Sequence, residues 1–547
     1  MGKSKVMSAA EAVALISDGD CITVSGTVMH MLPSKVLEAL EVRFLSEGHP
    51  RDVTWFDPFP TGLPAIEPLS HEGFLKRVIG GWYTPHPALR DLINQNKVEA
   101  YMYPLGTLSF WCQQMAASRD GYLTKVGLET YLDPRQGGGK LNAVTKEDLV
   151  ALVNLEGQEY LWYKRLPITA AVLRGTTSDA DGNISLEEEN LTMNVLHQAM
   201  AARRFGGKVI VQVKRVVPNG SIPPRLVALP GLLVDCVVVA PDQHRDEGNP
   251  DRDWLDQDKW IGRPPLTVAL SPDPAVWKSW LESGELPPHA LDELLANPAA
   301  DKVIARRAAL ELRAGEVVNI GAGLPGRNIN PAAIEEGLDE AVQLTAEGGV
   351  IGGIPSGVGL RGNVRFYFDT PGIFGFYNAG LITSTYLGML DFDRQGNVNN
   401  LRYGDTWVGP GGSMDIAHNA RRIVFCGTFT AGGLQVEAKE GRLHILHEGK
   451  VPRVLERVPA VCFNGPRMLR EGKEVLYVTE RAVFKLSAQG PVLTEVAPGV
   501  DIERDVIGRM LFRPVVAPDL HPMDQRIFRK ELMGLRNDES FSTPAVG

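Results

Sequence analysis

The stretch NLTMNVLHQAMAARRFGGKVIVQV (residues 190–213) decides the fold class, because it joins two kinds of pattern across a pair of glycines. Residues 190–205 are helix-like in composition, and residues 209–213 form a short β-branched run typical of a buried strand. The same rhythm recurs around VVNIG (residues 317–321) and RIVFCGTF (residues 422–429). Helices that alternate with short buried strands predict an α/β fold with largely parallel sheets.

Composition and charge limit the partners of this chain. Its 547 residues, 44% of them hydrophobic and 22% charged, are too many for one core, so we expect two or three domains. A formal net charge of −10 argues against nucleic acid as a partner and favours small molecules or copies of the chain itself. The five cysteines are scattered without C-x-x-C spacing, which indicates neither a disulfide framework nor a zinc site and fits a reducing cytoplasm.

No segment has the pattern of a membrane anchor. Near the N-terminus, Glu11 and Asp18 interrupt the apolar residues before they reach the length of a signal peptide. The longest apolar run, GLLVDCVVVA (residues 231–240), is about half as long as a membrane span requires and carries Asp235, so we interpret it as a buried strand. We therefore expect a soluble, cytoplasmic protein.

The two halves of the chain look related. TSDADGNIS (residues 177–185) and LDFDRQGNVN (residues 390–399) share their Asp, Gly and Asn residues, with Asn183 and Asn397 standing 214 positions apart. The same spacing brings Val209 onto Ile423, and ISDGDCITVSG (residues 16–26) resembles LRAGEVVNIGAG (residues 312–323). Two copies of one α/β unit explain these matches, with an insertion in the first copy; chance similarity is the alternative.

Residues 271–300, rich in Pro and Ser and without strand signals, form the expected connection between the halves. We therefore place an N-terminal domain at residues 1–270, a C-terminal domain at residues 301–536 and a flexible tail at residues 537–547.

Two loop motifs fall short of metal or nucleotide sites. TSDADGNISLEEEN (residues 177–190) begins like a calcium loop, but its glycine is misplaced and its twelfth residue is Asn190 instead of glutamate. A structural Asp-Gly turn is the better interpretation. PRQGGGKL (residues 134–141) lacks the first glycine and the final Ser or Thr of a Walker loop. The histidines form no H-x-x-x-H pair, and we expect no metal site.

Three glycine-rich segments remain. GAGLPG (residues 321–326) spells G-x-G-x-x-G, but Pro325 lies inside the turn and no acidic residue follows where a ribose contact requires one. Its backbone N–H groups suit a phosphate or a developing oxyanion, with a ligand-free turn as the alternative. GPGGSMD (residues 409–415) offers backbone N–H groups of the same kind, again with a ligand-free turn as the alternative. TAEGGVIGGIPSG (residues 345–357) contains Glu347, which composition alone does not distinguish from a solvated turn residue.

Several long segments, taken in order, carry a resemblance to a known family. The chain resembles the family I coenzyme A transferases, closest to the single-chain propionate or acetate CoA-transferases and 3-oxoacid CoA-transferases. The resemblance runs almost from end to end, through LTKVGLETYLDPRQGGGKLN (123–142), LRGTTSDADGNISLEEENLT (173–192), GKVIVQVKRV (207–216), LTAEGGVIGGIPSG (344–357), GPGGSMDI (409–416), VFCGTFTAGGL (424–434) and PDLHPMDQRIF (518–528).

This resemblance implies two homologous α/β domains with the active site between them. The family's nucleophilic glutamate falls on Glu347, whose carboxylate would attack an acyl-CoA thioester to give an acyl-glutamyl anhydride and then a glutamyl-CoA thioester. The family's oxyanion glycine falls on Gly412. CoA binding is assigned to Gly321, Ala322, Gly323, Leu324, Pro325 and Gly411.

The resemblance also implies the reaction partners. A short-chain acyl-CoA and a free carboxylic acid are the substrates, as in short-chain fatty acid, propionate or ketone body metabolism. Coenzyme A is a substrate, and no metal, ATP or permanently bound cofactor is needed. We expect a homo-oligomer, a dimer or a tetramer, with no nucleic-acid or membrane partner.

One position departs from the family pattern. The family has Gln-Gly after a strand of the first domain, with the glutamine amide as a second oxyanion donor, whereas YPLGTLSFW (residues 103–111) has Leu105 before Gly106. This change leaves two further hypotheses open. The protein could hydrolyse acyl-CoA through the same glutamate, or it could bind CoA or a nucleotide without turnover.

Overall fold

The computed structural model describes residues 5–244, 299–321, 323–338, 341–356, 359–538 and 541. These residues form two compact units. Unit 1 comprises the described residues of Met1–Trp254, Tyr367–Phe374 and Leu401–Asp415, and unit 2 those of Leu255–Phe366, Gly375–Asn400 and Ile416–Gly547. Of the connection expected at 271–300, only residues 299 and 300 are described, so the domain boundaries stay a prediction.

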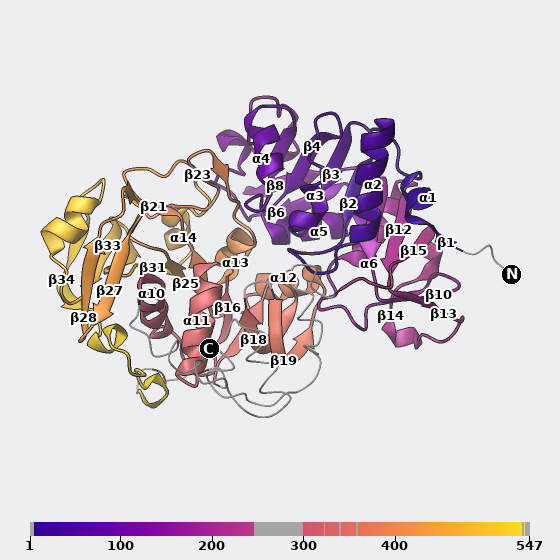
Figure 1. Cartoon of the computed structure of the whole chain (residues 1–547). Helices are drawn as coiled ribbons and strands as arrows, with labels where there is room; N and C mark the ends of the chain where they lie inside the picture. The colour runs from indigo at the N-terminus through magenta and orange to yellow at the C-terminus, as the bar shows by residue number, and fades with distance from the viewer. Residues whose placement is uncertain are drawn as a thin grey trace. The chain divides into compact units, whose positions relative to one another are not determined.

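Unit 1 is built on an eight-stranded sheet in which every pair of neighbours is parallel (Figure 1). In sheet order, the strands are β1 (Val6–Met7), β15 (Cys236–Val239), β12 (Lys208–Val213), β9 (Ala170–Arg174), β2 (Cys21–Val24), β3 (Val53–Phe56), β4 (Leu75–Gly80) and β5 (Glu99–Met102). Its helices are α1 (Ala9–Val13), α2 (Ser34–Glu47), α3 (Leu63–Ile66), α4 (Pro87–Asn94), α5 (Leu105–Ala116) and α6 (Val195–Arg204).

Smaller sheets complete unit 1. An antiparallel sheet is formed by β6 (Gly121–Thr124), β8 (Gln158–Lys164) and β7 (Val150–Leu155). A four-stranded sheet joins β13 (Arg215–Val217), β10 (Thr177–Asp179), β11 (Ile184–Ser185) and β14 (Val227–Leu229), and a hairpin joins β23 (Arg402–Tyr403) to β24 (Thr406–Trp407). The sheet of β6, β8 and β7 lies within the stretch where the sequence predicts an insertion in the first copy.

Unit 2 contains a ten-stranded sheet with a parallel centre. In order, its strands are β19 (Gly359–Tyr367), β18 (Val350–Ser356), β17 (Gln343–Ala346), β16 (Val317–Ile320), β20 (Ser384–Gly388), β25 (Arg422–Cys426), β31 (Glu474–Val478), β32 (Ala482–Ser487), β33 (Gly490–Val496) and β34 (Val515–Pro522). The helices in this part of the sequence are α10 (Ala300–Ala309), α11 (Leu324–Glu335), α12 (Thr370–Asn378), α13 (Ser413–Asn419) and α14 (Gly465–Arg470).

Short strands flank this sheet. The sheet order β22 (Val398–Asn399), β21 (Asp391–Asp393), β30 (Val454–Leu455) forms one group, and the pairs β26 (Thr430–Ala431) with β29 (Val451–Pro452) and β27 (Gln435–Lys439) with β28 (Arg442–His447) form two others.

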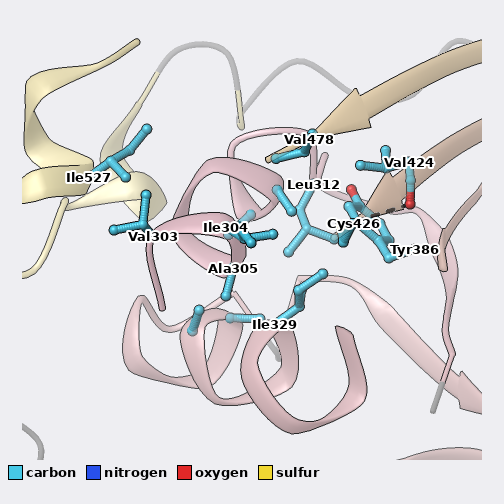
Figure 2. Packing of buried hydrophobic residues seen from close by; sticks show 14 of the residues in the cluster. Val303, Ile304, Ala305, Leu312, Ile329, Tyr386, Val424, Cys426, Val478 and Ile527 are labelled. Atoms are coloured by element: carbon cyan, nitrogen blue, oxygen red, sulfur yellow. Dashed lines mark hydrogen bonds between the residues drawn. The ribbon is translucent and has the colours of Figure 1, made fainter. Parts of the chain in front are cut away.

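The core of unit 2 forms where helices cover the parallel strands. Val303 and Ile304 of α10 and Ile329 of α11 are buried together with Tyr386 of β20 and Val424 of β25 (Figure 2). Alternation of helix and buried parallel strand produces this layer, because a parallel strand is apolar on both faces and must be covered. The predicted α/β class with largely parallel sheets is therefore confirmed.

The repeat seen in the sequence corresponds to equivalent elements in the two units. Strands β9, β10, β11 and β12 of unit 1 begin 214 positions before β20, β21, β22 and β25 of unit 2. Asp179 accepts hydrogen bonds from the N–H and Nδ2 of Asn183, both at 2.9 Å, and Asp393 accepts the same two from Asn397, at 3.0 and 3.2 Å. The loop that resembled a calcium site is thus an Asp-Gly turn present in both copies.

Two element predictions need correction. The run GLLVDCVVVA was interpreted as one strand, but Gly231–Leu233 form a 3-10 turn, Leu232 is exposed, and β15 begins only at Cys236. Asp235 ends the turn by accepting the N–H of Val209 at 2.8 Å, a role that a hydropathy pattern does not reveal. Likewise, α6 begins at Val195, five residues after the start of the helix-like stretch.

Candidate active site

Glu347 lies in a tight hairpin turn of unit 2. Strand β17 ends at Ala346, which pairs with Val350 at the start of antiparallel β18, so Glu347, Gly348 and Gly349 alone make the turn. The N–H of Gly349 donates to the carbonyl of Ala346 at 3.1 Å. Gly349 has φ +106°, a conformation that side chains oppose, which explains a glycine here. The turn leaves Glu347 half-buried at the carboxyl end of a central parallel strand.

The predicted CoA-binding turn follows the neighbouring strand. Strand β16 pairs in parallel with β17 and leads through Gly321 and Gly323 into α11, which begins at Leu324. The N–H of Gly321 donates to the carbonyl of Tyr386 at 2.8 Å, and a Cβ at Gly321 would lie 3.1 Å from the side chain of Leu387. Pro325 is buried and Gly323 is exposed, while Ala322 lies outside the described residues.

These two turns lie at a topological switch point. From β16 the chain passes through α11 to β17 on one side, and after β18, β19 and α12 it returns to β20 on the other side (Figure 1). Open α/β sheets bind ligands at the carboxyl ends of the strands where the chain changes direction in this way. The structure therefore brings Glu347 and the Gly321–Pro325 turn to the same edge of one sheet.

A layer of buried polar side chains lies under the two turns. Asn319 of β16, Thr345 of β17 and Thr385 of β20 face one another in register and are fully buried. The hydroxyl of Tyr377, near the end of α12, accepts from Asn319 Nδ2 at 3.1 Å and donates to Thr345 Oγ1 at 3.2 Å. Burial raises the pKa of the Tyr377 hydroxyl, and the nearby Glu347 carboxylate raises it further. Sequence reasoning missed this layer, although Asn319 and Thr345 interrupt apolar strand runs.

Gly411 and Gly412 belong to unit 1, in the turn that precedes α13. The N–H of Gly411 donates to the carbonyl of Gly81 at 3.2 Å, and the carbonyl of Gly411 accepts the N–H of Leu105 at 3.0 Å. Gly412 is buried, and its N–H donates to no other residue that the structure describes. The turn thus fixes Gly411 from both sides.

The segment in which the family resemblance expects a glutamine is also part of unit 1. Leu105 is buried at the start of α5, where its Cδ2 would lie 2.5 Å from a Cβ at Gly81. The N–H of Gly106 donates to Asp415 Oδ2 at 2.8 Å, and Thr107 Oγ1 donates to Asp415 Oδ1 at 2.9 Å. Since Asp415 and Gly411 occupy the backbone amides, neither Leu105 nor Gly106 has an N–H to offer. Sequence reasoning missed Asp415, whose partners stand about 300 positions away.

The described residues also bear on metal binding, membrane insertion and thiol chemistry. Among them, no group of three or more His, Cys, Asp or Glu side chains is arranged to hold a metal ion. None of the described helices is long and apolar enough to cross a membrane. The five cysteines are buried and form no disulfide, and burial raises the pKa of the Cys21 thiol to about 12.

Comparison with known proteins identifies relatives of the chain. Residues 6–240 match the family model described as coenzyme A transferase. The chain is 37% identical over 543 residues to the acetate CoA-transferase YdiF of Escherichia coli O157:H7, covering 97% of each protein. It is 35% identical over 545 residues to the caffeate CoA-transferase of Acetobacterium woodii, covering 97% of this chain and 99% of that protein.

A solved structure extends the likeness to the fold. The crystal structure of the E. coli O157:H7 acyl-CoA transferase YdiF in a thioester complex with CoA matches with a TM-score of 0.86 and 36% identity, over 97% of each chain. The fold and these relatives define an α/β enzyme of the CoA-transferase class. The chain belongs to the family I coenzyme A transferases, which confirms the resemblance found in the sequence.

Proposed function

We propose that this protein transfers CoA from a short-chain acyl-CoA to a free carboxylic acid, with Glu347 as the nucleophile. One observation carries the proposal: the Glu347 turn and the Gly321–Pro325 turn leave adjacent parallel strands at the switch point of one sheet. The names of the relatives, an acetate and a caffeate CoA-transferase, support a carboxylic acid as the acceptor.

The proposed reaction proceeds by a ping-pong mechanism. The Glu347 carboxylate attacks the thioester carbonyl, the C–S bond breaks, and an acyl-glutamyl anhydride forms with release of CoA thiolate. The thiolate then attacks the glutamyl carbonyl, which releases the first acid as a carboxylate and leaves a glutamyl-CoA thioester. The acceptor acid repeats these steps in reverse. One thioester replaces another, so the exchange needs no ATP, metal or bound cofactor.

Two sets of residues assist the proposed reaction, one by stabilising the oxyanion and one by binding CoA. Each attack generates a tetrahedral oxyanion, and the N–H of Gly412 is its donor, a contribution on the order of 3 kcal/mol. Gly321, Ala322, Gly323, Leu324 and Pro325, together with Gly411, bind CoA. Binding energy from the remote parts of CoA then assists the chemical steps.

Hydrolysis of acyl-CoA through the same glutamate is the second candidate function. The observation that favours it is the buried, apolar Leu105, beside a Gly106 amide that Asp415 already occupies. The family resemblance expects a glutamine at this position, and without that side-chain donor water becomes a competing acceptor. The hypothesis of a CoA-binding protein without turnover has no support from the relatives, which are named as enzymes.

We also propose a cytoplasmic homo-oligomer that acts in the metabolism of short-chain acids such as acetate and propionate. Five buried cysteines without a disulfide fit a reducing compartment.

A panel of acyl-CoA donors and carboxylate acceptors tests the proposed function. We expect CoA transfer to at least one short-chain acid, and a loss of at least about 10³-fold in Glu347→Ala. Glu440→Ala is the matched control, because Glu440 is an exposed turn glutamate of the same unit, and it should keep full activity. Thiol release without any acceptor, at the rate seen with the best acceptor, would favour the hydrolase; binding without any turnover would contradict both.

A further inference from the structure

The buried polar layer of unit 2 crosses three neighbouring strands at one level. Thr345, Asn319 and Thr385, which we call the polar row, pair across β17, β16 and β20 and are all fully buried. Thr385 Oγ1 donates directly to Asn319 Oδ1 at 3.2 Å. The Tyr377 hydroxyl joins Asn319 to Thr345, so hydrogen bonds connect the whole polar row. Central parallel strands are normally apolar on both faces, and a polar row in their middle requires another explanation.

The hydrogen bonds of this layer have one defined direction. Asn319 Nδ2 donates to the Tyr377 hydroxyl, Tyr377 donates to Thr345 Oγ1, and Thr345 Oγ1 donates to the carbonyl of Val318 at 3.0 Å. The hydroxyls of Tyr377 and Thr345 therefore each accept one hydrogen bond and donate another. A satisfied network of this kind holds its members in a unique arrangement, whereas an apolar contact would tolerate small shifts.

The polar row lies directly below both turns of the candidate site. Glu347 follows Thr345 by two positions, and Gly321 follows Asn319 by two positions. The single hydroxyl of Tyr377 connects the two strands from which these turns depart. A change in that connection would alter the separation of the two strands just before Glu347 and the CoA-binding turn.

We propose that Tyr377 is a positioning residue, whose hydroxyl fixes the Glu347 turn relative to the Gly321–Pro325 turn for attack on the thioester. This inference rests on the proposed function of Glu347. Tyr377 acts through its hydrogen bonds to Thr345 and Asn319, the residues that precede the two turns. Small displacements of a reacting group are costly, because bond formation requires close and aligned approach.

The test compares Tyr377→Phe with Tyr477→Phe. Tyr477 is also a fully buried tyrosine of unit 2, and its hydroxyl donates to the carbonyl of Gly396, in the turn between β21 and β22, at 2.6 Å. Tyr377→Phe loses two buried hydrogen bonds and Tyr477→Phe loses one, so urea unfolding of both variants checks that a difference in activity does not follow from a difference in stability. We expect kcat and the rate of covalent adduct formation to fall about 10-fold to 100-fold only in Tyr377→Phe, with the KM for acyl-CoA changed less than twofold.

A second pair of variants, at Thr345, tests the same connection even if Tyr377→Phe does not fold. Thr345→Val removes the hydroxyl that Tyr377 contacts and should slow adduct formation equally, whereas Thr345→Ser should restore it. The double variant Tyr377→Phe with Thr345→Val should be no slower than either single variant, since both break one connection.

The outcomes separate this inference from the proposed function. If Glu347→Ala is inactive while Tyr377→Phe and Thr345→Val react within twofold of Tyr477→Phe, only the positioning role is contradicted. If Glu347→Ala keeps full activity, the proposed function fails, and with it the inference.

Discussion

At Leu105, the sequence reveals a departure from the family pattern but not its structural consequence. The structure shows an apolar side chain buried against Gly81, and an Asp415 carboxylate that occupies the neighbouring Gly106 N–H. The position therefore supports the first turn of α5 and offers no hydrogen-bond donor.

Asp57 is a second residue whose role depends on burial. It follows β3, and its Oδ2 accepts from the N–H of Thr61 at 2.9 Å and from Thr61 Oγ1 at 3.0 Å. Burial raises the pKa of this carboxyl to about 7 from its usual value near 3.8. The folded protein thus keeps a proton between about pH 4 and pH 7 that the unfolded chain has released.

The Asp57→Asn variant tests this carboxyl. Raising the pH through that window weakens folding of the native protein by up to about 1.4 kcal/mol per pH unit, because the folded protein holds a proton that the unfolded chain releases. The uncharged variant lacks this loss, so its unfolding free energy relative to the native protein should rise on the order of 2 kcal/mol from about pH 5 to about pH 8. Urea unfolding at several pH values measures the difference.

The neighbouring His86 provides an internal control for this measurement. Its Nε2 donates to the carbonyl of Thr61 at 3.0 Å, and burial lowers the pKa of the imidazole to about 4. His86 therefore costs stability as the pH falls from about 6.5 to about 4, the opposite sign to Asp57. It is present in both proteins and cancels in their difference, so a difference that does not change with pH would refute the assignment to Asp57.

At the scale of elements, the turn before α13 is determined by close packing of glycine. Gly409 has φ +108°, and a Cβ there would lie 2.4 Å from the carbonyl oxygen of Gly81 and 2.9 Å from Trp82 Cα. Backbone atoms cannot move aside as a flexible side chain can. The turn that carries Gly411 and Gly412 therefore depends on Gly409.

We expect Gly409→Ala to lose about 3 kcal/mol of unfolding free energy in chemical denaturation, from the clash and the unfavourable φ together. The matched control is Gly404→Ala in the preceding hairpin, where φ is +55° but no atom lies within 4 Å of the added Cβ. It should lose only about 1 kcal/mol, from the backbone conformation alone. Equal losses in the two variants would show that packing on Gly81 is unimportant.

Some element predictions succeeded because the pattern was local. The apolar runs at 209–213 and 317–321 coincide with β12 and β16, since β-branched residues next to a glycine turn leave few alternatives. The prediction of one strand at 231–240 was wrong, because Leu232 is apolar yet exposed. The start of the strand is marked by a long-range contact, in which Asp235 accepts the N–H of Val209. Periodicity does not report such contacts.

At the scale of the whole molecule, the internal repeat was the most informative sequence feature. The spacing of 214 positions between Asn183 and Asn397 recurs in the strands and in the hydrogen bonds of the two Asp-Gly turns. The division into two units is harder to predict from the sequence, because residues 401–415 belong to unit 1 although they come late in the chain. Their partners, Gly81 and Gly106, stand hundreds of positions earlier.

The candidate site followed mainly from the family resemblance. That resemblance selected Glu347 among 66 acidic residues, which composition could not do. The structure adds that Glu347 and the Gly321–Pro325 turn share one sheet edge, and it adds Tyr377, which no motif indicated. Long-range hydrogen bonds between a helix and two strands have no short-range signature in a sequence.

The most direct test of the account is covalent labelling of Glu347. The protein is incubated with an acyl-CoA, trapped with hydroxylamine or borohydride, digested and analysed by mass spectrometry. We predict one modified residue, Glu347, and no modification at that position in Glu347→Ala. A modification at another residue, or an unmodified Glu347 in protein that transfers CoA under the same conditions, would contradict the central claim.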